Sequence, residues 1–229
     1  MAVIGRVGAV LAGRAAPLGA GGLTSAIAKQ PVAGPAWVSS LGLAGDEQAD
    51  RRVHGGIDKA VHAYAAGHYA AWQAELGAVA VPWQAGAFGE NLSVEGVDEQ
   101  GVCLGDLWRV GRAELRVSQG RQPCFKLNRR FGVADMAARV QDSLRAGWYL
   151  RVERPGTVQA GDAILRLARP HPEASVAALL ALIRDRVCDP ARLAPVLALP
   201  LPPSWQRLFA QRLARGEAED WARRLRGGG

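Results

Sequence analysis

The chain has 229 residues, of which 49% are hydrophobic, and it carries seven tryptophans and a formal net charge of +7. This length allows one large domain, or one domain with a small appendage, and the apolar content excludes an intrinsically disordered chain. Three of the 28 basic residues are lysines and the rest are arginines, in a chain rich in alanine. That composition indicates a coding bias more than a nucleic-acid surface, so we expect no nucleic-acid partner.

The sequence has no stretch that is long and apolar enough to cross a membrane, and its first residues lack the apolar core of a signal peptide. Its three cysteines, Cys103, Cys124 and Cys188, lie far apart and show no zinc-ligand spacing. Such sparse cysteines are typical of a reducing compartment. We therefore expect a soluble cytoplasmic protein with no membrane partner.

Hydrophobic patterning up to about residue 170 predicts mostly short strands joined by turns. In chain order, strands are predicted at 2–11, 37–43, 107–110, 114–118, 148–152 and 163–167, with a loop or hairpin over 13–35. Helical spacing of apolar residues predicts helices at 67–76 and 133–145. Because strands and helices do not alternate regularly, the pattern favours a mixed α+β fold or a β-barrel over a doubly wound sheet.

The pattern changes after Arg169–Pro172, a double-proline segment that is typical of a linker. Only short helices are predicted beyond it: one capped by Ser175 and ending near 187, one at 190–199, one capped by Ser204, and a last turn around Trp221. The expected domains are therefore 1–170 and 171–229. The second domain is too small to bury a sizeable core alone, so we expect it to pack on the first domain or on a partner.

The segment Ser118–Leu127 has the strongest chemical character, because Cys124 follows a proline there and lies between Arg121 and Lys126. The window 109–130 carries seven basic residues and one acid. A positive field stabilises a thiolate, which is both a nucleophile and a soft metal ligand, and the cations could neutralise a phosphate-bearing ligand. The same local sequence also fits a buried cysteine at the end of a strand.

A second polar segment contains the paired glycines Gly55 and Gly56, which allow the backbone to approach a ligand closely. Nearby, Lys59 could meet a phosphate and His54 could donate a hydrogen bond. The spacing is not that of a P-loop, and a solvated surface turn is the alternative interpretation. In a third segment, Asn91 follows a flexible glycine and could bind the edge of a heterocycle.

Taken in order, the motifs follow one pattern along nearly the whole chain. They are Gly42-Leu43 with Gly45-Asp46, the segment 49–60, Phe88–Leu92, Gly105-Asp106, Ser118–Leu127 and Gly147–Val152. This set resembles the MOSC domain, and within it the 6-N-hydroxylaminopurine resistance family. The helical tail, with Ser204-Trp205 and Glu219–Trp221, is similar to the three-helix domain that follows the MOSC domain in that family.

The resemblance implies an α+β, predominantly β fold, with a MOSC-type β-barrel, peripheral helices and a small C-terminal helical domain. It implies a molybdenum cofactor (a molybdopterin) whose metal is ligated by Cys124, the expected catalytic residue. At the superfamily level it also carries an association with pyridoxal phosphate. The cofactor-binding residues that the resemblance implies are Arg121, Lys59, His54, Gly55, Gly56, Asn91 and Lys126.

The activity that the resemblance implies is reduction of N-hydroxylated purines and related small compounds to amines, which detoxifies base analogues. The chain shows no flavin, haem or iron–sulfur motif, so an external reductase is the expected electron donor. Two positions depart from the family pattern, Gly120 and Ala65, where proline is usual. A cofactor or sulfur carrier with a persulfide on Cys124, and a hydrolase with His54 as base, stay open as alternatives; the oligomeric state stays open as well.

Overall fold

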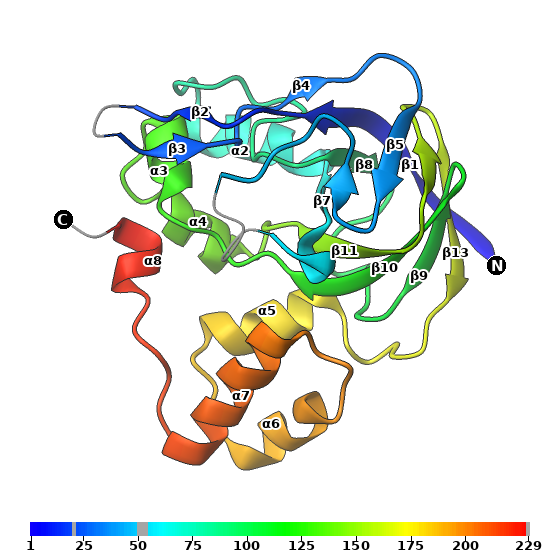
Figure 1. Ribbon diagram of the computed structural model, residues 1–229. Coiled ribbons are helices and arrows are strands. Elements are labelled where there is room, and N and C mark those ends of the chain that lie inside the picture. The colour runs from blue at the N-terminus through cyan, green and yellow to red at the C-terminus, as the bar shows by residue number, and fades with distance from the viewer. Residues whose placement is uncertain (20–21, 50–54, 228–229) are drawn as a thin grey trace.

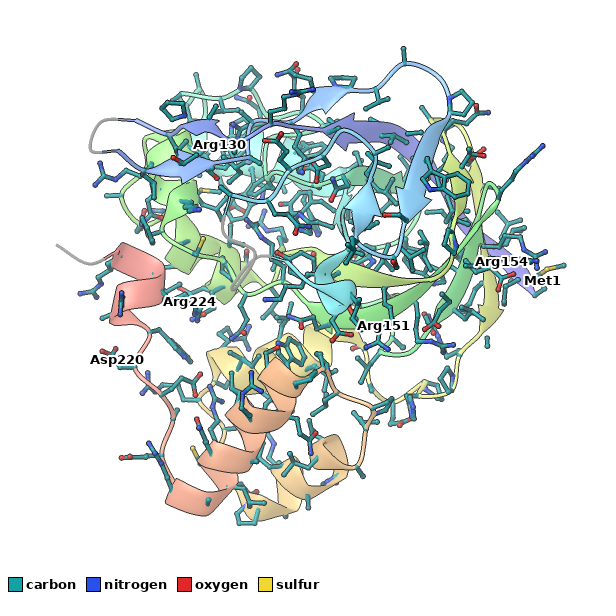
Figure 2. The ribbon with its side chains drawn as sticks, viewed as in Figure 1. Met1, Arg130, Arg151, Arg154, Asp220 and Arg224 are labelled. Carbon is teal, nitrogen blue, oxygen red and sulfur yellow. The ribbon has the colours of Figure 1, made fainter. Side chains whose placement is uncertain are left out.

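The structure is a computed structural model that describes residues 1–19, 22–49 and 55–227. Figure 1 shows a β-barrel with helices against its side and a group of C-terminal helices below it. Figure 2, in the same view, places Met1 and Arg154 at the side of the barrel away from Arg224, which lies near the end of the chain. The expected predominantly β fold with peripheral helices is confirmed.

Seven strands of the described chain close into a barrel. The barrel closes because the first of these strands pairs with the last, with Ala2–Arg6 opposite Ala163–Arg166. Closure leaves these strands without the open edges that an isolated sheet exposes. Around the barrel the strands are β13 (Ala163–Ala168), β9 (Leu107–Val110), β10 (Ala113–Gly120), β11 (Trp148–Arg154), β7 (Val61–Ala65), β8 (Leu92–Glu95) and β1 (Ala2–Ala12). Neighbours are antiparallel except β7 and β8, which are parallel.

The other strands are short and lie outside the seven-stranded barrel. They are β4 (Gln30–Pro31), which pairs with β1, the hairpin of β2 (Ala16–Pro17) and β3 (Thr24–Ser25), and a small sheet of β12 (Gly156–Val158), β5 (Ala36–Ser39) and β6 (Gly42–Leu43). The predicted strand over 37–43 is two strands of a tight hairpin whose turn lies at residues 40–41. Gly42 follows this turn with a φ of +130°, a backbone conformation that favours glycine.

The helices follow the predicted order, apart from two short elements that were not predicted and the start of one helix. They are the 3₁₀ turn η1 (Ile57–Lys59), α2 (Gly67–Leu76), α3 (Lys126–Phe131), α4 (Met136–Ser143), α5 (Val176–Arg184), α6 (Pro190–Leu197), α7 (Pro203–Arg215) and α8 (Ala222–Arg226). Ser175 caps α5 as predicted, since its Oγ accepts from the Ala178 amide at 3.1 Å. The predicted Ser204 cap is wrong: Pro202 is the N-cap and Pro203 the first helical residue, so α7 begins two residues earlier than predicted, because proline suits the first turn of a helix. The predictions included neither η1 nor α3.

The core continues from the barrel into the C-terminal helices. The barrel buries Trp108 and Trp148 completely, and α7 buries Trp205 and Phe209 completely in the same apolar cluster. Helix α5 packs on β10, where Gly120 provides the room: a Cβ atom at Gly120 would lie 2.8 Å from Cγ of Leu180. Gly120, where the family pattern has proline, therefore leaves the space that the Leu180 side chain of α5 occupies. None of the helices in the described ranges combines the length and the apolar character needed to cross a membrane.

Candidate functional site

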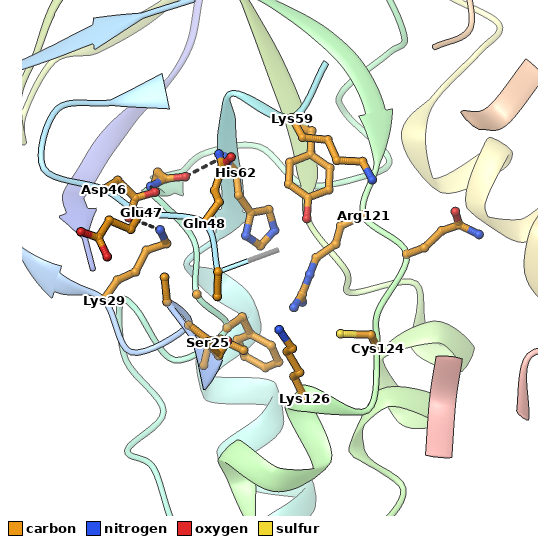
Figure 3. Close-up of a pocket in the computed structure, with 18 residues that line it drawn as sticks. Ser25, Lys29, Asp46, Glu47, Gln48, Lys59, His62, Arg121, Cys124 and Lys126 are labelled. Carbon is orange, nitrogen blue, oxygen red and sulfur yellow. Dashed lines mark hydrogen bonds and ion pairs between the residues drawn. The ribbon is translucent and has the colours of Figure 1, made fainter. Parts of the chain in front are cut away.

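One mouth of the barrel opens into a pocket where the ends of several strands meet (Figure 3). About 690 Å³ of it is free of protein atoms, a volume that includes its solvent-open part. The lining residues are Ser25, Ala26, Ile27, Lys29, Asp46, Glu47, Gln48, Ala49, Lys59, His62, Phe88, Gly89, Asn91, Arg121, Gln122, Cys124, Lys126 and Tyr149. Cations and one thiol thus converge from segments that lie far apart in the sequence.

The cysteine loop, residues 121–125, connects the end of β10 to the start of α3. Its first residue is fixed by a hydrogen bond from the Arg121 amide to the Gly147 carbonyl at 2.9 Å. Its end turns into α3, where the Leu127 amide donates to the Cys124 carbonyl at 3.0 Å. Cys124 is half-buried, and Figure 3 shows its thiol pointing toward the space that Arg121 and Lys126 also enter.

Arg121, the cation of the cysteine loop, is buried, with only 6% of its surface exposed. Its Nη1 makes no hydrogen bond to any residue that the structure describes. A buried guanidinium nitrogen without a partner is costly, which indicates a place for an anionic ligand. Arg121 lies beside Tyr149, and burial raises the pKa of Tyr149 more than Arg121 lowers it, so that hydroxyl is protonated at neutral pH.

His62 enters the pocket from β7 and is 5% exposed. Burial, and then the charge of Arg121, hold the pKa of His62 well below its usual value, so the imidazole is neutral at pH 7. Its Nε2 has no well-aligned partner among the described residues. Gly147 makes room for the ring, since a Cβ there would lie 2.7 Å from this Nε2, and its φ of +76° also favours glycine.

Lys59 is presented by the short turn η1, which two strands hold in place. Arg151 of β11 donates from Nε to the Asp58 carboxylate at 3.0 Å, and Ser118 of β10 donates from Oγ to the Asp58 carbonyl at 2.5 Å. The Lys59 Nζ lies 5.8 Å from the centre of the Tyr149 ring. Burial lowers the pKa of Lys59, against the opposing effects of Asp58 and Cys124.

Asn91 lines the pocket, but its side-chain amide hydrogen-bonds neighbouring segments of the protein. Its Oδ1 accepts from the His62 amide at 3.0 Å, and its Nδ2 donates to the Leu11 carbonyl at 3.2 Å and to Asp46 at 2.8 Å. Asp46 in turn pairs with Lys29, and both side chains are less than one tenth exposed. This network fixes the pocket wall opposite the cysteine loop.

The structure brings together five of the residues singled out in the sequence, Cys124, Arg121, Lys126, Lys59 and Asn91. Gly55 and Gly56 precede η1 and do not line the pocket; they lead the chain into the turn that carries Lys59. His54 lies outside the described residues.

The pocket residues that were not singled out as site residues in the sequence include His62, Tyr149, Lys29 and Asp46. Two of them, Tyr149 and Asp46, belong to motifs that carried the family resemblance, which is the signal that could have identified them. His62 and Lys29 gave no local signal, because only barrel closure and a long-range ion pair bring them to the site.

Known proteins resemble this chain along most of its length. The MOSC domain family matches residues 50–165. The chain is 41% identical to Protein YiiM of Escherichia coli (strain K12) over 207 residues, which cover 90% of this chain and 92% of YiiM. It is 39% identical over 194 residues to a protein named "Reductase" from Gibberella moniliformis, covering 84% of this chain and 34% of that protein.

Solved structures of two relatives share the fold along most of the chain. The structure of YiiM from Escherichia coli has a TM-score of 0.79 and 32% identity, covering 96% of this chain and 98% of that chain. The structure of YiiM from Geobacillus stearothermophilus has a TM-score of 0.77 and 30% identity, covering 91% of this chain and 99% of that chain.

Proposed function

Because the chain belongs to the MOSC domain family, we propose that it is a molybdenum-cofactor-dependent oxidoreductase that reduces N-hydroxylated purines and related compounds to amines. MOSC domains are generally associated with molybdenum cofactor binding. The observation that carries the proposal is the pocket in which the Cys124 thiol lies with the buried, incompletely paired guanidinium of Arg121.

The residues of the pocket fit such a cofactor chemically. When bound, the cofactor would supply a two-electron redox centre for cleavage of the N–O bond, with a metal that accepts a thiolate ligand and a terminal phosphate. Cys124 would provide the thiolate, since a soft anionic sulfur suits the metal. Arg121 would hold the phosphate through its unpartnered Nη1, with Lys59 and Lys126 adding positive charge along the pocket.

The overall reaction breaks the N–O bond of the substrate and forms an N–H bond. It consumes two electrons and two protons per molecule and releases water with the amine. On the protein side, the Tyr149 hydroxyl holds its proton at neutral pH and can donate a hydrogen bond into the pocket. His62 is neutral there, so its imidazole can contact a heterocyclic ligand without adding a further charge beside Arg121.

Electrons would come from a separate reductase. The chain spans about a third of the Gibberella moniliformis relative named "Reductase", so most of that longer protein has no counterpart here. Within the given sequence there is no flavin, haem or iron–sulfur motif, so an external donor is the partner that we propose for the enzyme. Detoxification of N-hydroxylated base analogues is the corresponding role.

The test uses full-length protein from a host that makes the molybdenum cofactor. Reduction of 6-N-hydroxylaminopurine by a chemical reductant is followed for the wild type, for Cys124→Ser and for the matched control Cys188→Ser, whose cysteine belongs to the helical region. We expect the wild type and the control to produce amine, and Cys124→Ser to fall to background, because the metal ligand is lost.

Other outcomes would select the alternatives. Cofactor or labile sulfur bound without any turnover would favour a carrier that uses Cys124 as a persulfide site. Cysteine-dependent hydrolysis by protein free of molybdenum would favour a nucleophilic hydrolase. Equal turnover by wild type and Cys124→Ser would contradict the role given to the thiol.

A further inference from the structure

The last helix of the described chain, α8, packs directly against the cysteine loop. The Phe125 amide donates to the Arg224 carbonyl at 2.7 Å, and Asn128 Nδ2 donates to the Leu225 carbonyl at 2.8 Å. These bonds join segments about 100 residues apart in the sequence. The residue after Cys124 therefore has its backbone amide satisfied by the C-terminal helix and not by its own helix.

Arg224 strengthens this contact with its side chain. Its Nη1 donates to the Pro123 carbonyl at 2.6 Å and its Nη2 donates to Gln141 Oε1 of α4 at 2.5 Å. Figure 2 shows Arg224 on the side of α8 that faces the barrel. The guanidinium is close enough to Cys124 for the two to interact electrostatically. The Arg224 side chain thus links Pro123, the residue before Cys124, to helix α4.

Helix α8 is itself anchored to the other C-terminal helices. Trp221 Nε1 donates to Glu219 at 2.7 Å, and the same carboxylate pairs with Arg212 of α7 at 2.8 and 2.9 Å. Arg212 is 1% exposed and also donates to the carbonyls of Leu182 and Ile183 at the end of α5. The helix that carries Arg224 is therefore connected, through Glu219 and Arg212, to α7 and to the end of α5.

We propose that Arg224 is a positioning residue for Cys124, supplied to the barrel pocket by the C-terminal helical region. The inference rests on the proposed function only in taking Cys124 as the reactive thiol. Its physical basis is that the cysteine loop depends on α8 for the Phe125 and Pro123 hydrogen bonds. Without that support the thiol would sample several positions, and a misplaced ligand lowers activity even where binding persists.

The first test measures amide hydrogen exchange on the full chain without cofactor. Arg224→Ala is compared with Arg223→Ala, a matched control on the same helix whose side chain is exposed. For Arg224→Ala we expect exchange in peptides covering 121–127 to become roughly tenfold faster, while peptides of β1 and β13 stay unchanged. Arg223→Ala is expected to match the wild type.

A second variant guards against global unfolding and tests the geometry. Arg224→Lys keeps the charge, but one ammonium group does not reproduce the fork that meets Pro123 and Gln141 together, so we expect it to restore only part of the protection. If Arg224→Ala unfolds the chain, Arg224→Lys decides. If Arg224→Ala folds, wild-type exchange rates in 121–127 for both variants would overturn the proposal. If Arg224→Ala unfolds, wild-type exchange rates in 121–127 for Arg224→Lys alone would overturn it.

The consequence for catalysis is measured in cofactor-loaded protein. Arg224→Ala should lower kcat and leave KM nearly unchanged, because it displaces the thiol without removing a substrate contact. An unchanged kcat despite faster exchange in 121–127 would overturn the positioning role. Absence of turnover in every variant, including the wild type, would instead reject the proposed function, and the exchange result would still decide whether α8 orders the loop.

Discussion

The Arg121 side chain is buried, and its Nη1 has no hydrogen-bond partner among the described residues. A buried charged group that lacks a partner lowers the free energy of unfolding of the cofactor-free protein. We predict that Arg121→Met leaves the free energy of unfolding of the cofactor-free protein unchanged or raises it by about 1 to 2 kcal/mol, because a buried charge is replaced by an apolar chain of similar length. The same variant should lose molybdenum during purification. Urea unfolding and metal analysis of the same preparations check both parts.

A destabilisation of several kcal/mol by Arg121→Met would contradict this view. It would mean that the Arg121 guanidinium stabilises the fold, through Tyr149 or the cysteine loop, and is not an anion-binding group. Lys126→Met is the control for charge alone, since Lys126 is half-buried and donates to the Thr24 carbonyl at 3.2 Å.

At the residue scale, the sequence revealed the part of the site that is local. Arg121, Cys124 and Lys126 lie within six positions of one another, so their shared chemistry is visible without a structure. Arg224 reaches the same loop from a hundred residues away, and one arginine among many carries no signal of that contact. Tyr149 was visible only as part of a family motif.

At the scale of elements, the contact between β10 and α5 depends on a missing side chain. We predict that Gly120→Val costs about 1 to 3 kcal/mol of unfolding free energy, because its Cβ would lie 2.8 Å from Leu180 Cγ and overpack the interface. Leu180→Ala alone should also destabilise the protein, by leaving a cavity.

The double variant Gly120→Val with Leu180→Ala separates packing from backbone effects. We expect it to cost at least about 0.5 kcal/mol less than the sum of the two single variants, since the new side chain fills the space that Leu180 vacates. Additive costs in urea unfolding would show that the two residues do not compete for the same space.

The connection between α7 and α8 should weaken in acid. Burial alone would raise the pKa of Glu219, but hydrogen bonds from Arg212 and Trp221 lower it to about 2. A carboxyl with a lowered folded-state pKa stabilises the protein above its unfolded value of 4.5, and this contribution is lost as the pH falls from 4.5 toward 2.

Glu219→Gln removes this dependence. Because the side chain is 35% exposed, we expect the wild type to exceed the variant by only about 1 to 2 kcal/mol at pH 6. The difference should shrink by pH 2.5 in chemical unfolding. A difference that stays constant between the two pH values would show that the carboxylate charge is not the cause.

Long periodic elements were predictable and short ones were not. Helix α2 has the predicted bounds, and the residues that it buries, Tyr69 and Trp72, are two of those whose spacing predicted it. Helix α3 has only six residues and follows directly on the cysteine loop, so its pattern is too short to separate from the loop. The start of α7 was misplaced because the serine signal outweighed the two prolines before it.

At the scale of the whole molecule, barrel closure creates the site. Pairing of β1 with β13 and of β7 with β8 brings the ends of strands that are distant in the chain to one mouth. Strand patterns alone do not fix which strands pair, so the topology came from the family resemblance and not from periodicity. Helix α8 then contacts the cysteine loop from outside the pocket, so the C-terminal helical region supports one wall of the site.

The measurement that tests the central claim most directly is X-ray absorption at the molybdenum edge of the full-length protein, purified from a cofactor-sufficient host. The account predicts one more sulfur ligand on molybdenum in the wild type than in Cys124→Ser, because Cys124 would provide that ligand. The Cys188→Ser control should match the wild type. An equal sulfur count in wild type and Cys124→Ser, or wild-type protein without molybdenum, would contradict the account.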